Sequence, residues 1–221
     1  MGTTPAKAAL FDSLASVAQA LGNGRRAEIV DVLDQGERSV DELAAEISQS
    51  VANTSQHLQV LSRAGLVRSR RAGNRVFYRL ADDGVGELWA AVRDVATRRV
   101  AEVGVLADDY LGDRAEIEPV SVAELARRLA LGDVVVLDVR PETEYRAGHI
   151  AGSRSVPLPT LEAVAPTLPR RAQIVAYCRG PYCVYAHDAV RILRSRGLKA
   201  RHLDVGFPEW RRAGLPVETP A

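Results

Sequence analysis

The sequence predicts an α/β protein of two domains, the first mostly helical with a β-hairpin and the second built on a parallel sheet. In the first half, apolar residues recur at helical spacing, and one pair of alternating strands surrounds a Gly-Asn turn. From about residue 120, all-apolar strands alternate with helices, which is typical of a parallel sheet. A chain of 221 residues can bury two modest cores. We expect domains at 1–110 and 120–221, joined by a polar linker at 111–119.

Four helices are expected before the hairpin. Ser39 and Glu42 have the spacing of a capping box at the start of the third helix. The third and fourth helices are short and separated by a three-residue turn, which is the shape of a helix-turn-helix. The inner face of the fourth helix is expected to consist of Val51, Thr54, Leu58 and Leu61. The four helices are expected over 4–21, 25–34, 40–47 and 51–64.

The hairpin that follows is strongly basic. Alternating strands over 66–71 and 75–80 flank Ala72-Gly73-Asn74. Six arginines and no acidic residue lie between positions 63 and 79. A basic hairpin alone is more often a solvated surface, but directly after a helix-turn-helix it favours contact with phosphates. The arginines are Arg63, Arg68, Arg70, Arg71, Arg75 and Arg79.

Residues 40–80 resemble the winged-helix domain of ArsR-type transcriptional repressors, above all in the His-Leu-x-x-Leu-x-x-Ala-Gly-Leu-Val pattern of 57–67. The resemblance implies a homodimer on palindromic operator DNA, with the recognition helix in the major groove and the wings beside it. It also assigns the first helix and a long helix expected over 84–111 to the dimer interface. The residues expected at DNA are Ser50, Asn53, Ser55, Gln56 and Gln59 on the helix, with Asn53 and Gln56 reading bases, and Arg70, Arg71 and Arg75 on the wing.

The metal-sensing residues of that family are missing from this half of the chain. Those members use cysteine pairs before the recognition helix, or Asp and His clusters on the last helix. Here residues 41–46 contain no cysteine, and 84–111 contain no histidine. No metal is therefore expected, and the sensing chemistry is expected elsewhere in the chain.

Both cysteines lie in one short stretch between an apolar strand at 172–177 and a helix at 184–195. A strand that turns into a helix within a few residues leaves backbone amides directed at the helix N-terminus, where anions bind. Arg179 adds a positive charge beside Cys178, and both features favour the reactive thiolate form of a cysteine. Gly180 permits a sharp turn and Pro181 stiffens it. A reactive Cys178 is predicted, with an inert core cysteine as the alternative.

Residues 120–218 resemble a rhodanese domain over segments 137–153, 177–180 and 207–216. The resemblance implies that Cys178 accepts a sulfane sulfur as a persulfide, held by the backbone amides of 179–183. One departure is Val205, where many members have the first of two glycines. The catalytic loop is expected to comprise Cys178, Arg179, Gly180, Pro181, Tyr182 and Cys183. By the same resemblance, Asp138, Arg140, Glu144 and His149 chiefly brace the fold.

The role of Cys183 stays open between two interpretations. It is a small residue at the start of a helix, or it attacks the persulfide on Cys178 and forms a disulfide or sulfur-bridged link. A metal site from Cys178, Cys183 and His187 is a weaker idea, because it lacks a fourth ligand.

Our hypothesis from the sequence is a DNA-binding repressor that senses persulfide, polysulfide or thiosulfate through Cys178, alone or together with Cys183, and then releases its operator. One alternative is a sulfurtransferase localised by a DNA-binding domain, so enzymatic turnover stays open. Another is a repressor that responds to oxidants or arsenite through both cysteines. No cofactor is expected. Without an 18-residue apolar run or a signal peptide, we expect a cytoplasmic protein that does not engage membranes, and two cysteines fit a reducing compartment.

Overall fold

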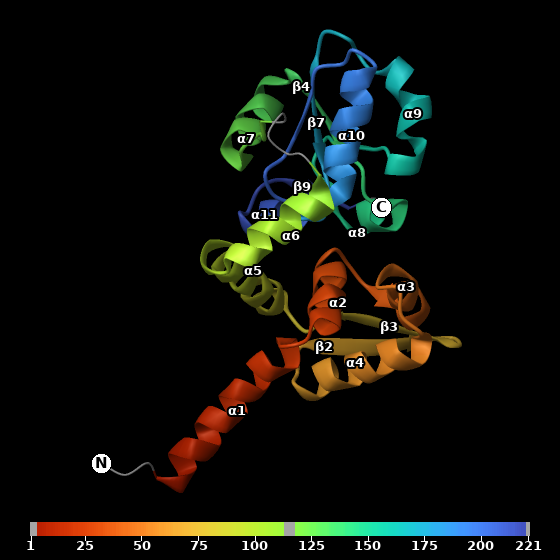
Figure 1. Ribbon diagram of the computed structural model, residues 1–221. Coiled ribbons are helices and arrows are strands. Elements are labelled where there is room, and N and C mark those ends of the chain that lie inside the picture. Colours follow the sequence, from red (N-terminus) through yellow and green to blue (C-terminus); the bar gives the residue numbers. More distant parts are fainter. Residues whose placement is uncertain (1–3, 113–117, 220–221) are drawn as a thin grey trace. The chain divides into compact units, whose positions relative to one another are not determined.

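The computed structural model describes residues 4–112 and 118–219 (Figure 1). The chain divides into two compact units, residues 1–94 and 95–221. The linker expected over 111–119 includes residues 113–117, which lie outside the described residues. The predicted fold class is confirmed, with helices and a hairpin in the first unit and a parallel sheet in the second.

The first unit combines helices with a small antiparallel sheet of strand order β1-β3-β2. The hairpin pairs Val67 with Leu80 and Ala72 with Arg75 around a turn in which Gly73 has a φ of 59°. The sequence does not predict β1, because two residues show no periodicity. The elements are α1 (Pro5–Leu21), α2 (Gly24–Asp34), β1 (Arg38–Ser39), α3 (Val40–Glu46), α4 (Val51–Arg63), β2 (Val67–Ala72) and β3 (Arg75–Leu80).

The helix starts follow from their capping residues. Ser39 accepts a hydrogen bond from the Glu42 amide, and the Glu42 carboxylate accepts one from the Ser39 amide, so the predicted capping box is present. Ser50 caps α4 by accepting from the Asn53 amide at 3.2 Å. On α4 the predicted inner face is correct for Thr54, Leu58 and Leu61, which are fully buried, but wrong for Val51, which is 47% exposed.

The prediction of a single helix over 84–111 is wrong. The chain forms α5 (Asp83–Arg99) and α6 (Ala101–Leu111), separated by Val100 in an extended conformation with φ −109° and ψ 99°. Past this break, Ala107 and Leu111 are buried, and Arg191 of the second unit donates to the Leu111 carbonyl at 2.8 Å.

The second unit contains a four-stranded parallel sheet of order β6-β4-β7-β8, and Val120 forms a parallel bridge to Leu203 beyond β8. Its elements are α7 (Val122–Leu131), β4 (Val134–Asp138), α8 (Glu142–Ala147), β5 (His149–Ile150), β6 (Arg154–Ser155), α9 (Leu161–Val164), β7 (Gln173–Tyr177), α10 (Val184–Ser195), β8 (Ala200–His202), α11 (Phe207–Arg212) and β9 (Val217–Glu218), with 3-10 turns at Leu158–Thr160 and Ala165–Thr167.

Alternate side chains of β7 enter two cores, one on each face of the sheet. Ile174 and Ala176 belong to the core that also includes residues of α9 and α10. Val175 and Tyr177 belong to the other, with residues of α7 and α11. Figure 1 shows α7 and α10 on opposite faces. Cys178 continues the alternation and joins the core on the α10 face.

Candidate functional site

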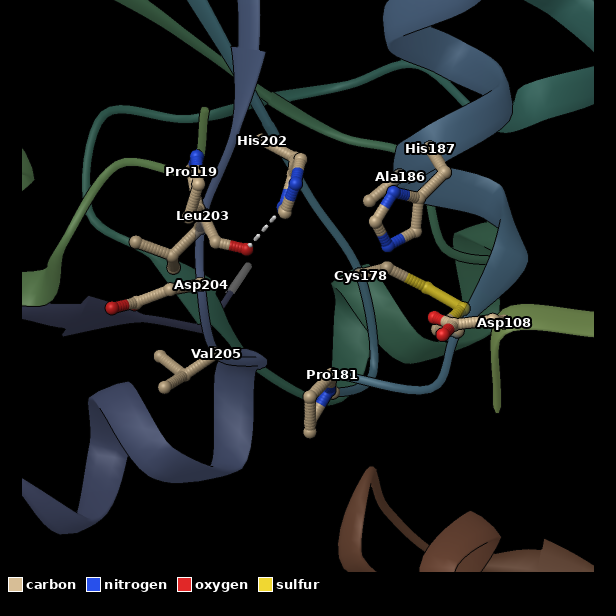
Figure 2. Close-up of a pocket in the computed structure, with 12 residues that line it drawn as sticks. Asp108, Pro119, Cys178, Pro181, Ala186, His187, His202, Leu203, Asp204 and Val205 are labelled. Atoms are coloured by element: carbon tan, nitrogen blue, oxygen red, sulfur yellow. Dashed lines mark hydrogen bonds between the residues drawn. A yellow bond between two sulfur atoms is a disulfide. The ribbon is translucent and has the colours of Figure 1, made fainter. Parts of the chain in front are cut away.

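The six residues between β7 and α10 hold both cysteines. Cys178 directly follows the last residue of β7 and is 1% exposed. Cys183 occupies the N-cap position of α10 without a capping side-chain hydrogen bond. The two sulfur atoms are joined in a disulfide, with 6.3 Å between the Cα atoms (Figure 2). The loop therefore returns on itself and places both sulfur atoms at one point.

The backbone of this loop packs against the segment at the start of α11. The Phe207 amide donates to the Cys178 carbonyl at 3.1 Å. A Cβ atom on Gly206 would overlap the carbonyl group of Arg179 and the amide of Gly180. Glycine at 206 is thus required by close approach of two backbone segments, and not by a left-handed conformation.

The predicted cradle of amides needs a correction. Pro181 has no amide hydrogen. The Cys183 amide donates to the Gly180 carbonyl at 3.1 Å, which closes a turn within the loop. Of the five residues expected to supply amides, Pro181 and Cys183 therefore offer none to an anion.

The side chains of Arg179 and Tyr182 are engaged away from the sulfur atoms. Arg179 forms a two-armed ion pair with Glu144, with Nη2 2.6 Å from Oε1, and the Glu144 side chain is fully buried. The Tyr182 hydroxyl hydrogen-bonds to the Thr97 hydroxyl, which lies in the same unit near the end of α5. The arginine next to Cys178 in sequence thus anchors the loop to α8.

A pocket of about 420 Å³ opens beside the disulfide (Figure 2). Four of the six expected loop residues line it, whereas Arg179 and Tyr182 are not part of the lining. The remaining lining residues come from other elements, and the sequence singles out one of them, His187, only as a weaker metal-ligand idea. The lining consists of Asp108, Pro119, Cys178, Gly180, Pro181, Cys183, Ala186, His187, His202, Leu203, Asp204 and Val205.

The sequence pattern could have placed some of these other lining residues near the cysteine loop. His202 ends β8, which pairs with β7 in parallel, so both strands deliver their last residues to one edge of the sheet. His187 is one helical turn beyond the start of α10. Asp108 carries no such signal, because its helix was expected in the other domain.

Two histidines and two carboxylates, Asp108 and Asp204, give the pocket its polar character. The rings of His187 and His202 have centroids 4.4 Å apart, and His202 Nδ1 is 3.0 Å from the Leu203 carbonyl oxygen. Burial raises the pKa of the Asp204 carboxyl from its ordinary value. These groups can exchange protons and hydrogen bonds with a ligand beside the sulfur atoms.

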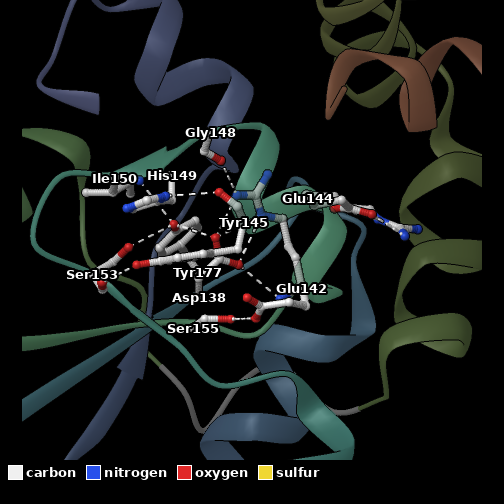
Figure 3. A network of polar contacts seen from close by, with 12 residues as sticks. Asp138, Glu142, Glu144, Tyr145, Gly148, His149, Ile150, Ser153, Ser155 and Tyr177 are labelled. Carbon is white, nitrogen blue, oxygen red and sulfur yellow. Dashed lines mark hydrogen bonds and ion pairs between the residues drawn. The ribbon is translucent and has the colours of Figure 1, made fainter. Parts of the chain in front are cut away.

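A second polar cluster lies at the end of β4 and braces the fold (Figure 3). Asp138 and Arg140 form a fully buried ion pair, and Arg140 also donates to the Gly148 carbonyl at 2.8 Å. The Tyr177 hydroxyl donates to Asp138 at 2.6 Å and accepts from the Ile150 amide at 3.1 Å. Burial and the adjacent Asp138 carboxylate raise the pKa of Tyr177 well above its ordinary value, so this phenol keeps its proton.

Most of the helix and wing residues expected at DNA are exposed. Asn53, Gln56 and Gln59 of α4 are exposed, as are Arg71 and Arg75 near the tip of the hairpin. Ser55 is half-buried, and Ser50 serves as the cap of α4. Arg70 is exposed but pairs with Glu37, at 2.8 Å from Nε to Oε1. Any contact of Arg70 with phosphate would compete with this ion pair.

Comparison with known protein families separates the same two parts of the chain. Residues 23–69 match the family described as bacterial regulatory protein, arsR family, and residues 121–213 match the rhodanese-like domain. The chain is 46% identical over 217 residues to the HTH-type transcriptional regulator Rv0324 of Mycobacterium tuberculosis, covering 98% of this chain and 95% of that one.

Two solved structures each match one half. The homodimeric winged helix-turn-helix DNA-binding domain Mb0332 of Mycobacterium bovis is 42% identical and covers 46% of this chain and 94% of its own, with a TM-score of 0.42. A rhodanese-related protein of Thermoplasma volcanium is 26% identical and covers 47% and 99%, with a TM-score of 0.43.

A winged helix-turn-helix followed by a rhodanese-like domain defines a two-domain transcriptional regulator. The match to a transcriptional regulator extends over nearly the whole chain, and so covers both domains. The chain belongs to the ArsR family of bacterial transcriptional regulators, in the form that has a C-terminal rhodanese-like domain. None of its described helices is long and apolar enough to cross a membrane.

Proposed function

We propose that this regulator is a repressor that binds operator DNA as a homodimer and releases it when a sulfane sulfur reacts at Cys178. The observation that carries the proposal is the pairing of Cys178 and Cys183 within one loop that borders an open pocket. A structural disulfide has no need of such a pocket. A pair of cysteines that reacts with a small sulfur donor does.

The chemistry proceeds in two balanced steps. The Cys178 thiolate first attacks the outer sulfur of the donor, so that one S–S bond forms and one breaks, and sulfite leaves from thiosulfate or a thiolate leaves from a persulfide. The product is a persulfide anion on Cys178. The Cys183 thiolate then attacks Cys178 Sγ and displaces hydrosulfide. The two thiols lose two electrons in total, the sulfane sulfur gains them, and the disulfide remains.

Exposed apolar side chains support the dimer. On α1, Leu10, Phe11 and Leu14 are each more than half exposed in the single chain. Leu88 and Val92 on α5 are also exposed. Single exposed apolar residues are ordinary, but a stripe along one helix favours an interface. A second copy of this chain would cover them.

The link to DNA affinity is proposed to pass through α5. This helix begins in the first unit and ends in the second, where Thr97 contacts Tyr182 of the cysteine loop. Tyr182 precedes Cys183, so closing or opening the disulfide changes the position of its hydroxyl relative to Thr97. A tenfold loss of DNA affinity requires only about 1.4 kcal/mol of difference between the two states.

The test measures operator binding and intact mass on the same samples of the full-length chain. Reduced protein is expected to bind operator, and one equivalent of a polysulfide donor should lower the affinity as Cys178 gains sulfur or forms its bond to Cys183. Cys178→Ser should keep operator binding and lose the response. Release of operator from Cys178→Ser by the same donor would refute the sensing role of this cysteine.

The open pocket also favours a second function, transfer of sulfur to an external acceptor. Under that alternative, a small acceptor enters the pocket and removes the outer sulfur before Cys183 reacts. Many equivalents of thiosulfate consumed per chain would support a sulfurtransferase, whereas stoichiometric loading supports a sensor. Release by peroxide or arsenite at doses where polysulfide has no effect would favour an oxidant- or arsenite-responsive repressor.

A further inference from the structure

The pocket beside the cysteine pair has no permanently cationic side chain among the described residues that line it. Arg179 is the nearest arginine to Cys178 in sequence, but it pairs with buried Glu144 and is absent from the lining. The described lining itself therefore contributes no lysine or arginine to contact an entering donor.

The two imidazoles are the remaining sources of positive charge. The centroids of the His187 and His202 rings are 4.4 Å apart, and two imidazolium ions at that separation would repel each other. Asp108 and Asp204 add two carboxylates to the same lining. Like charge on these carboxylates opposes the entry of an anion.

The rest of the lining is apolar. Val205 contributes an aliphatic side chain, and the lining also includes Pro119, Pro181, Ala186 and Leu203. Sulfur chains are polarisable and weakly hydrated, so they gain dispersion contacts against such a surface. A charged donor would lose hydration there without gaining an ion pair.

We propose that this pocket selects uncharged sulfane-sulfur donors, such as organic polysulfanes, over dianionic thiosulfate, and that Asp108 and Asp204 set the selectivity. This inference rests on the proposed function, because it names the class of donor for the same cysteine. With a dialkyl trisulfide, the Cys178 thiolate attacks the central sulfane sulfur, an alkyl thiolate leaves with the electron pair of the broken S–S bond, and Cys178 holds the sulfane sulfur in a mixed trisulfide. The Cys183 thiolate then attacks Cys178 Sγ, which closes the disulfide and releases an alkyl persulfide anion.

The first experiment compares two probes on the reduced full-length chain. Loss of the reduced intact mass gives second-order rate constants for thiosulfate and for dimethyl trisulfide. Each is divided by the rate constant of 2-mercaptoethanol with the same donor, which removes the intrinsic reactivity of the donor. The chain is expected to favour the trisulfide by about tenfold or more on this normalised scale. Equal normalised rates, or a preference for thiosulfate, would overturn the proposal.

Matched variants locate the selectivity. Asp204→Asn and Asp108→Asn are each expected to raise the normalised ratio of thiosulfate to trisulfide rates by about threefold to tenfold, since each removes one like charge. Asp109→Asn is the control, because Asp109 neighbours Asp108 on α6, is exposed and lies outside the lining. A rise of the same size in Asp109→Asn would show a general charge effect and would count against a role of the pocket.

A salt series on the unmodified chain does not depend on how the variants fold. Raising the ionic strength from about 0.02 M to about 0.5 M shortens the Debye length several-fold. The normalised thiosulfate rate should therefore increase, while the normalised trisulfide rate stays constant. If neither probe modifies Cys178, the proposed function fails together with the inference. If both react with equal normalised rates, the inference alone fails.

Discussion

The segments that follow β4 and β7 begin at the same edge of the parallel sheet, but their surroundings differ. After β4, the buried Asp138–Arg140 pair has a hydrogen-bonding partner for each charged group. After β7, Cys178 and Cys183 border a pocket. Asp138 and Tyr177 are even register partners across the two strands. The comparison shows that position at this edge does not by itself make a titratable residue reactive. A residue there can meet a ligand only where a pocket opens beside it, as it does beside the cysteines.

The largest effect is expected from breaking the buried pair. Asp138→Ala leaves Arg140 buried without its counter-charge, which should cost about 3–5 kcal/mol of unfolding free energy. Trp210 is buried in the second unit, so its fluorescence in a Trp89→Phe background follows urea unfolding of that unit alone. Asp133→Ala, at a half-exposed side chain before β4, should change the same free energy by about 0.5 kcal/mol or less. If Asp138→Ala lowers the unfolding free energy only slightly, the segment after β4 does not have the structural role that distinguishes it from the segment after β7.

An intermediate effect is expected where the cysteine loop meets the start of α11. Gly206→Ala forces a Cβ against the Arg179 carbonyl, and the backbone shift should cost about 1–3 kcal/mol in the same assay. It should also change the rate at which an alkylating reagent modifies Cys178 in the reduced chain. Gly104→Ala is the control, because no atom lies within 4 Å of its added Cβ inside α6. That change should stabilise by up to about 1 kcal/mol.

The smallest effect on stability is expected at Cys183. In reducing buffer, Cys183→Ser should change the unfolding free energy by about 0.5 kcal/mol or less, since this side chain is only half-buried. The substitution should nevertheless abolish the second chemical step, closure of the internal disulfide. After a polysulfide donor, intact mass should show added sulfur retained on Cys178 and no internal disulfide. Donor-treated Cys183→Ser that carries no added sulfur would contradict the two-step scheme.

The sequence predicts the elements that have a strong pattern. The apolar runs of β4 and β7 and the capping box at Ser39 each specify local structure without help from the rest of the fold. The position of Cys178 at the carboxyl end of β7 follows from the same pattern. Residues that follow a buried strand are confined to one edge of the sheet, so the site could be located from the chain alone.

Other features have no local cause. The break at Val100 occurs without glycine or proline at that position, inside a continuing apolar stripe. The engagement of Arg179 by Glu144 joins residues that are 35 positions apart. The sequence places that arginine beside the thiol, but packing directs it to α8. The part of the pocket lining that comes from distant segments, such as Asp108, depends on long-range contacts and could not be predicted.

The spacing of the two cysteines has a kinetic consequence. Both sulfur atoms belong to one six-residue stretch of a single chain. Closure of the bond between them is therefore a first-order event, driven by a high effective concentration that dilution does not change. Each copy of the protein sets its own state, however many copies are present. In a dimer, one subunit would be closed while the other is still open, so the population would pass through half-converted assemblies.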